Sequence, residues 1–278
     1  MGRSESLDEV RAYYDSIFPF YEKESIARAH LDFWRGLARQ WRPARILEIG
    51  AGFGRITRAL ARHAPAIGID ISLPMLVHAA RQLSSSSCAR FVAADMRRLS
   101  FPCCFDLIVA PSDPFSHLLT AAERRQALCR VAKLLSPSGR FVLEGLYRRA
   151  RRQEERERQF RHPDGVLTIS ESWRPVGSRQ LWHATYRYLD RGKNRPDRSV
   201  ESSFTARAWE PPRLRRLFQS CGLRIEKLWG DLDQRSFGRD SRRIMVVARP
   251  LAEAGNNKDI VFRNGRHRHR STRRRRAT

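Results

Sequence analysis

The chain has 278 residues, 41% of them hydrophobic, which is enough to bury one substantial core. It shows neither an apolar amino-terminal leader nor an apolar run of about eighteen residues, which argues against export and against membrane spanning. Its five cysteines are an odd number without zinc-like spacing, so we expect free thiols, a cytoplasmic location and no metal site. The formal charge of +25 comes from arginines throughout the chain, which is typical of a solvated basic surface and leaves nucleic-acid binding as a disfavoured possibility.

Two amphipathic helices are expected at the start of the chain. The first runs from Leu7 to Phe20, and we expect Pro19 to end it; the second runs from Tyr21 to Gln40. Residues 1–43 are therefore interpreted as a helical segment that precedes the first strand.

The stretch from Arg45 to Ala61 predicts a strand, a glycine turn and a helix. The three glycines Gly50, Gly52 and Gly54 follow the strand, and Glu48 lies two residues before the first of them. A dinucleotide turn has its third glycine one place later. A carboxylate beside the turn also repels a pyrophosphate, whereas it suits a ligand with a cationic amino group.

This Glu-x-Gly-x-Gly-x-Gly pattern resembles the first motif of the class I S-adenosylmethionine-dependent methyltransferases. The resemblance implies S-adenosylmethionine as the cofactor. It places the cofactor-binding residues of the turn at Glu48, Gly50, Ala51, Gly52 and Gly54.

Two further strands end in acidic residues. Ala66 to Ile71 is a buried strand whose Asp70 lies about twenty residues beyond the first glycine, where a ribose diol needs a bidentate acceptor. After a helix from Leu73 to Leu83, the strand from Arg90 to Met96 leads into a loop that contacts the adenine ring in the family. Asp95 would accept from the adenine amine, with Ile71 and Met96 as apolar walls. Taken singly, either aspartate could instead be a helix cap.

The alternation of strands and helices continues to Glu144 and predicts an α/β fold. The remaining core elements are the strands Phe105–Ala110 and Gly139–Glu144 and the helix Ala121–Leu135. Such alternation gives parallel strands joined by right-handed crossovers. We expect a Rossmann-like, doubly wound, mostly parallel seven-stranded sheet of order 3-2-1-4-5-7-6 with its last strand antiparallel, in which residues 44–146 bind the cofactor at the carboxyl ends of the strands, near Ala110.

Residues 147–206 interrupt this pattern. Arg148 to Arg161 is interpreted as a helix or mobile connector, and three β-rich runs then follow, Gly165–Trp173, Arg179–Leu189 and Arg198–Ala206. This insertion resembles the substrate lids of bacterial amino-sugar and glycine-type N-methyltransferases. Its residues Trp173, Trp182, His183, Tyr186 and Tyr188 either cage an amine by cation–π contact or pack in the lid.

The chain returns to the core over residues 207–250. A helix from Pro211 to Ser220 and the strands Leu223–Gly230 and Arg242–Ala248 are expected there. Residues 251–278 form a basic tail that is expected to be disordered and capable of adhering to RNA or to an anionic membrane.

The loop after the fourth strand carries the candidate catalytic residues. His117 is the candidate base, with Asp113 to orient it or a substrate amine, although His117 could equally cap a helix. The same resemblance implies that the helical segment of residues 1–43 lies over the cofactor pocket. It also implies that Tyr13, Tyr14 or Tyr21 touches the methionyl end of the cofactor, and Tyr14 is the tyrosine we assign to that contact. Enzymes that methylate exocyclic amines of nucleic-acid bases carry an Asn/Asp-Pro-Pro-Tyr/Phe pattern in this loop. The loop here is only weakly similar to that pattern, so a small-molecule acceptor is favoured.

The sequence therefore predicts an S-adenosylmethionine-dependent methyltransferase that acts on a nitrogen or oxygen of a small molecule by in-line displacement. Two alternatives stay open: a methyltransferase of RNA or another macromolecule that uses the basic surface, and a non-catalytic regulatory protein that binds the cofactor.

Overall fold

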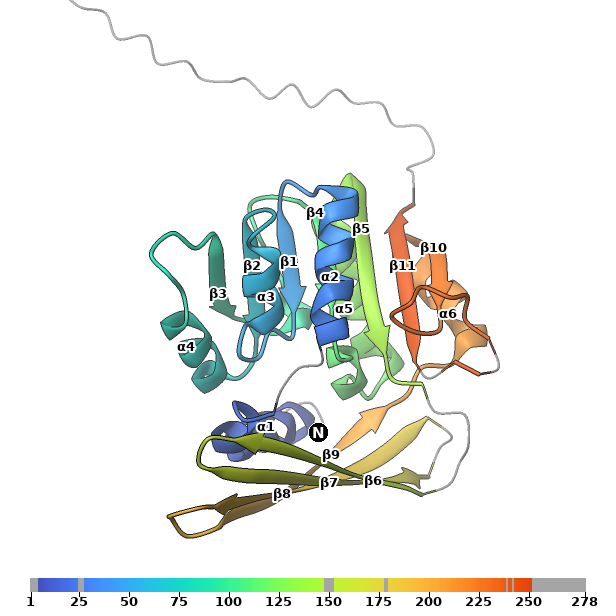
Figure 1. The fold of residues 1–278 in the computed structure, drawn as a ribbon. Coiled ribbons are helices and arrows are strands. Elements are labelled where there is room, and N and C mark those ends of the chain that lie inside the picture. The colour runs from blue at the N-terminus through green and yellow to red at the C-terminus, as the bar shows by residue number, and fades with distance from the viewer. Residues whose placement is uncertain are drawn as a thin grey trace, which may run out of the picture.

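The computed structural model describes residues 5–24, 28–147, 153–177, 180–238, 240–241 and 243–251. Two β-sheets lie one above the other, and the helix α1 (Glu5–Tyr21) runs between them (Figure 1). Beyond Leu251, the basic tail expected from the sequence lies outside the described residues.

The larger sheet has seven strands in the order β3-β2-β1-β4-β5-β11-β10. Their bounds are β1 (Ile46–Ile49), β2 (Ala66–Asp70), β3 (Ala89–Ala93), β4 (Phe105–Ala110), β5 (Leu135–Gly145), β10 (Leu223–Trp229) and β11 (Ile244–Pro250). Strand β11 pairs antiparallel with both of its neighbours, and the other pairings are parallel. This order and direction confirm the fold class expected from the sequence.

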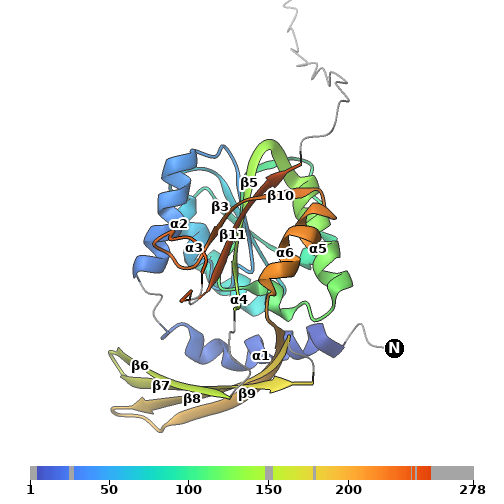
Figure 2. The ribbon, with the colours of Figure 1, turned by 90° about the vertical axis from the view of Figure 1, so that its right-hand side faces the viewer.

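Helices cover both faces of the larger sheet. They are α2 (Arg28–Trp41), α3 (Arg55–Leu60), α4 (Leu73–Arg81), α5 (Ala121–Leu134) and α6 (Pro211–Gln219). Side chains alternate along each strand, so Ile46 packs in the cluster with α2 and α3, whereas Leu47 packs in the cluster with α5 and α6. Figure 2 shows these two helix pairs on opposite sides of the sheet.

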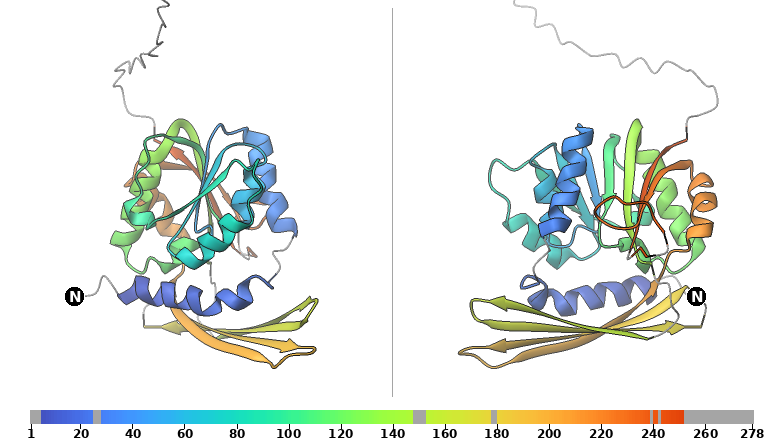
Figure 3. Two further views of the ribbon diagram at one scale, coloured as in Figure 1. Left: turned by 90° about the vertical axis from the view of Figure 1, so that its left-hand side faces the viewer. Right: turned by 45° about the vertical axis from the view of Figure 1, so that its right-hand side comes forward.

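The smaller sheet, which we call the lid, is an antiparallel meander inserted between β5 and α6. It consists of β6 (Glu154–His162), β7 (Gly165–Val176), β8 (Leu181–Gly192) and β9 (Arg198–Arg207). One face of the lid packs on α1 through a buried cluster that includes Ile17, Leu167 and Phe204 (Figure 3). Helix α1 is therefore held between the lid and the larger sheet.

Two expectations for secondary structure are wrong. Helix α1 continues through Pro19 to Tyr21 because Phe20 is buried against the lid, with its ring centroid 5.8 Å from that of Tyr188; the second helix then begins only at Arg28. The charged stretch does not form a helix over residues 154–161. These residues form β6, an edge strand whose exposed charges discourage pairing with another chain. Residues 148–152 lie outside the described residues.

Candidate active site

The glycine turn after β1 brings the backbone against the segment after β4 and against strand β3. Gly50 has φ 77°, and a Cβ there would lie 2.7 Å from Cβ of Pro114. Gly54 has φ 65° and caps α3, and a Cβ there would lie 2.2 Å from the ring of Phe91. Glycine is therefore required at both positions for conformation and for space.

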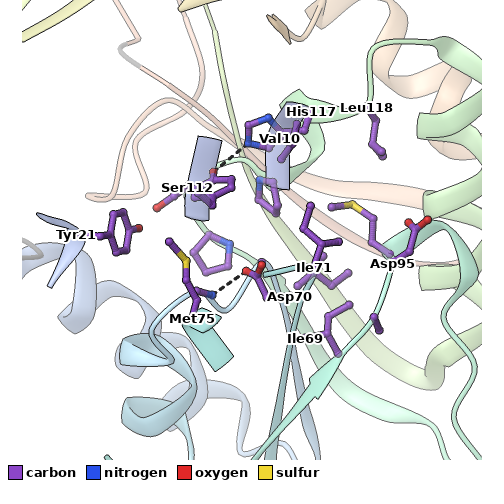
Figure 4. A pocket seen from close by; sticks show the side chains of 18 residues that line it. Val10, Tyr21, Ile69, Asp70, Ile71, Met75, Asp95, Ser112, His117 and Leu118 are labelled. Atoms are coloured by element: carbon purple, nitrogen blue, oxygen red, sulfur yellow. Dashed lines mark hydrogen bonds between the residues drawn. The ribbon is translucent and has the colours of Figure 1, made fainter. Parts of the chain in front are cut away.

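A cavity, here called the first cavity, opens over the carboxyl ends of β1, β2, β3 and β4. Residues of the glycine turn, of the ends of β2 and β3, and of the loop after β4 line it, and α1 covers it with Val10, Tyr14 and Tyr21. Figure 4 shows Asp70 and Met75 on one side of this cavity and His117 and Val10 on the other. The position agrees with the general rule for ligand sites in open α/β sheets.

Asp70, at the end of β2, is held in the first cavity by two backbone N–H groups. Its Oδ2 accepts a hydrogen bond of 2.8 Å from the N–H of Gly52, and its Oδ1 accepts one of 2.9 Å from the N–H of Ser72. Burial raises the pKa of Asp70, and these backbone N–H groups act against that rise. Each oxygen keeps a further lone pair, so the carboxylate can still accept from a ligand diol.

Asp95 also lines the first cavity, next to Ile71 and Met96. Its carboxylate is already held by Arg97, whose Nε lies 3.0 Å and whose Nη2 lies 2.8 Å from Oδ2. Burial opposes the charged form of Asp95, but the hydrogen bonds from Arg97 outweigh it and lower the pKa. Asp95 therefore has less capacity left for a ligand than Asp70.

Four residues expected at the cofactor do not line the first cavity. Ala51 and Gly54 pack behind the turn, and Ala110 is fully buried within β4, so Pro111 and Ser112 of the next loop line the wall instead. Glu48 points into the core, where it accepts a hydrogen bond from the hydroxyl of Thr57. Burial raises the pKa of Glu48 to about 8, so its carboxyl is not the anion beside the turn that the sequence suggested.

His117 and Tyr14 form a hydrogen-bonded pair at the wall of the first cavity. The hydroxyl of Tyr14, on α1, lies 3.0 Å from Nε2 of His117, which ends the short 3₁₀ helix η2 (Pro114–His117). Burial lowers the pKa of His117 to about 4 and raises the pKa of Tyr14 well above its ordinary value, so both groups are neutral at pH 7. Within the described residues, Nδ1 of His117 is buried without a hydrogen-bond partner.

A second cavity of about 510 Å³ lies between the lid and the larger sheet, and it shares Tyr14, Tyr21, Ser112 and His117 with the first cavity. Its aromatic wall comes from Tyr13 on α1 and from the lid residues Trp173, Tyr186, Tyr188 and Phe204. Trp182 and His183, also expected there, are absent from its lining. The Tyr14–His117 pair thus lies where the two cavities adjoin.

The second cavity also contains charged residues that sequence reasoning missed. Glu144, at the end of β5, accepts hydrogen bonds from Nε2 of His30 (2.7 Å), from the N–H of Ser112 (2.9 Å) and from Nη1 of Arg243 (2.5 Å). Burial opposes ionisation of Glu144, but His30 and Arg243 lower its pKa. The one feature of the sequence that could have indicated Glu144 is its position, at the carboxyl end of a central strand.

Asp113 does not contact His117. Its Oδ2 accepts a hydrogen bond of 2.5 Å from the N–H of Leu146, and its Oδ1 accepts one of 3.2 Å from Nε1 of Trp209. The Asp113 carboxylate is occupied by groups that join the lid to the core, so it does not orient His117 by a direct hydrogen bond. Its other expected role, at a substrate amine, stays a prediction.

In the described part of the chain, no group of three or more His, Cys, Asp or Glu side chains is placed to hold a metal ion. The helices in that part are all too short or too polar to cross a bilayer.

The seven-stranded sheet, its order and the cavity at its carboxyl edge define the class I methyltransferase fold. Residues 46–139 match the family described as "Methyltransferase domain". Residues 46–139 of this chain thus match a methyltransferase domain, and the fold is the one that the resemblance to class I S-adenosylmethionine-dependent methyltransferases predicts.

Among curated proteins, the chain is 37% identical over 100 residues to an uncharacterized methyltransferase, GK2543, of Geobacillus kaustophilus; the match covers 35% of this chain and 44% of that protein. The chain spans about half the length of the curated relatives it matches.

Two solved structures share the fold over most of the chain. The CcbJ methyltransferase from Streptomyces caelestis has a TM-score of 0.72 at 21% identity and covers 86% of this chain and 98% of its own. CalS10 is an amino pentose methyltransferase from Micromonospora echinaspora whose structure contains S-adenosylmethionine. It has a TM-score of 0.66 at 20% identity, and the match covers 83% of this chain and 94% of CalS10.

Proposed function

We propose that this protein transfers a methyl group from S-adenosylmethionine, bound in the first cavity, to a nitrogen or oxygen atom of a small molecule bound in the second cavity, with an amine nitrogen favoured. The proposal rests mainly on one observation: the two cavities adjoin at Tyr14 and His117, which line both of them. In-line displacement requires the nucleophile and the leaving sulfur to lie on opposite sides of the methyl carbon, and two adjoining cavities, one for each reactant, meet this requirement.

The residues of the first cavity fit the proposed cofactor. Asp70 offers two oxygens to the ribose diol, the glycine turn leaves the backbone accessible, and Ile71 and Met96 supply apolar surface for a base. When bound, S-adenosylmethionine supplies a methyl group on a positively charged sulfur. Helix α1 excludes water from this place by covering the cavity with Tyr14 and Tyr21.

Three features favour an amine nitrogen over a hydroxyl oxygen. An alcohol or phenol must lose its proton to attack, and His117, neutral and with a pKa of about 4, is a weak base that no carboxylate supports. A neutral amine already has a lone pair, and the proton that it loses after the transfer can pass to solvent. The hydroxyl of Tyr14, or Nδ1 of His117, which has no partner within the described residues, can accept from its N–H. The second cavity also has four carboxylates against two guanidinium groups in a chain of net charge +25, which favours a basic acceptor. The similarity to an amino pentose methyltransferase agrees with this choice.

The test is a turnover assay on matched acceptors. The protein is incubated with S-adenosylmethionine and with pairs of amino sugars and hydroxy sugars, simple amines, phenols and RNA, and adenosylhomocysteine is measured. We expect turnover with an amino compound and at least about tenfold less with its hydroxyl analogue. Turnover only with RNA would contradict a small-molecule acceptor. Cofactor binding by calorimetry without turnover on the panel would support the regulatory alternative.

A further inference from the structure

The chain passes between the larger sheet and the lid at two places, and one carboxylate is bonded to both. The outward passage is at Leu146, after β5, and the return passage is at Trp209, before α6. Asp113, only 6% exposed, accepts from the N–H of Leu146 and from Nε1 of Trp209. The two passages also bond each other, because the N–H of Trp209 donates to the carbonyl of Leu146 at 2.9 Å.

Arg124, on α5, connects the return passage to the residue after His117. Its guanidinium carbon lies 4.1 Å from the ring centroid of Trp209, and Nη1 donates to the carbonyl of Ala208 at 3.2 Å. Its Nε donates to the carbonyl of Leu118 at 3.1 Å. Arg124 is 4% exposed, and its positive charge acts against the rise that burial causes in the pKa of Asp113.

The backbone between β4 and His117 is in an unfavourable conformation that needs such support. Ser112 has φ 57° and Asp113 has φ 51°, in the left-handed region that non-glycine residues rarely adopt. Glu144 holds the N–H of Ser112, and the carbonyl of Asp113 accepts from both the N–H and the hydroxyl of Ser116. The position of His117 therefore depends on how this loop is anchored.

We propose that Asp113 is a positioning residue that fixes the lid and the loop carrying His117 relative to each other, so that the aromatic wall of the second cavity and the imidazole move as one unit. The proposal rests on the proposed function and deepens it. Asp113 acts through Leu146 and Trp209 on one side and through its own loop on the other, without touching His117.

The test compares two aspartates near opposite ends of β4. Asp113 follows the carboxyl end of the strand, whereas Asp106 lies at its amino end and lines neither cavity. Asp106 accepts from the N–H groups of Ala44 and Arg45 at 3.0 and 3.1 Å and from the hydroxyl of Ser136 at 2.7 Å. Amide hydrogen exchange is measured by NMR on the adenosylhomocysteine-saturated protein carrying Asp113→Asn or Asp106→Asn. An asparagine keeps one acceptor and places an NH₂ group against one of the donors.

In Asp113→Asn, we expect exchange at Leu146, Trp209 and Ser116 to Leu118 to rise together, at least about tenfold, with the Kd for adenosylhomocysteine changed less than about threefold. In Asp106→Asn, only Ala44, Arg45 and their surroundings should respond. A rise confined to Leu146 and Trp209, with Ser116 to Leu118 unchanged, would overturn the proposal.

If Asp113→Asn does not fold, Trp209→Phe replaces it, because this change removes one donor and keeps a ring under Arg124. The same joint rise is expected and the same confined rise would overturn the proposal. Because exchange is read without an acceptor, failure of the turnover assay would contradict the proposed function and leave this result standing. Where an amine acceptor turns over, Asp113→Asn should lower kcat at least about tenfold and Asp106→Asn should not.

Discussion

The two cavities differ in how the chain builds them. The first is formed by short loops that follow consecutive parallel strands, so Gly50, Asp70 and Asp95 are brought together by the sheet order alone. The second depends on residues as distant in sequence as Tyr13 and Phe204, whose ring centroids lie 4.6 Å apart. Binding at the first cavity therefore depends on local geometry, whereas the second depends on how α1 and the lid dock.

The largest effect is expected at Asp70. Replacing it with alanine removes the acceptor for a ribose diol and leaves the N–H of Gly52 without its partner, so affinity for adenosylhomocysteine should fall roughly 100-fold, or about 2.7 kcal/mol. Asp95→Ala is the matched comparison, with a loss of about tenfold or less, because Arg97 already occupies that carboxylate. Calorimetry gives both values, and an equal loss would remove the distinction between the two acids.

The next effect concerns the place where the cavities adjoin. We expect His117→Asn to lower kcat for an amine acceptor roughly 10- to 100-fold while the Kd for adenosylhomocysteine changes less than about fivefold. Tyr14→Phe keeps the ring and removes the hydroxyl, and the double variant should be little slower than the slower single variant if the pair acts as a unit. If the losses in kcat of the two single variants simply multiplied in the double variant, the claim that Tyr14 and His117 act as a unit would be wrong.

The third prediction concerns stability and tests Glu48, which is buried in the core behind the first cavity. The raised pKa of Glu48, about 8, means that the folded protein holds a proton that the unfolded chain releases above about pH 4.5. Stability should therefore decrease as pH rises from about 5 to 8, and Glu48→Gln should flatten this profile by roughly 1–3 kcal/mol. Urea unfolding at several pH values measures it, with the exposed Glu9→Gln as a control that leaves the slope unchanged.

The smallest effect tests the docking of α1 on the lid. The hydroxyls of Tyr13 and Tyr188 lie 3.3 Å apart in the aromatic wall of the second cavity. Tyr188→Phe should cost about 1 kcal/mol in the free energy of unfolding, and the Tyr13→Phe/Tyr188→Phe double variant should cost less than the sum of the two single variants. Exact additivity in denaturant unfolding would show that this hydrogen bond contributes nothing.

The same contrast explains which features could be predicted from the sequence. Strand and glycine spacing predicted the sheet order and placed Asp70, Asp95 and Gly50 at the first cavity, because parallel strands bring their carboxyl ends to one edge. Glu48 was misplaced because the period of a fully buried strand does not tell which face a side chain takes. The roles of Asp113 and Glu144 depend on partners 33 and 99 residues away, which no local pattern carries.

The most direct test of the account is a crystal structure of the protein with adenosylhomocysteine. We predict that the ribose hydroxyls hydrogen-bond to Asp70 in the first cavity and that the sulfur faces Tyr14 and His117, toward the second cavity. A ligand bound without contact to Asp70, or with its sulfur directed away from the Tyr14–His117 pair, would contradict it.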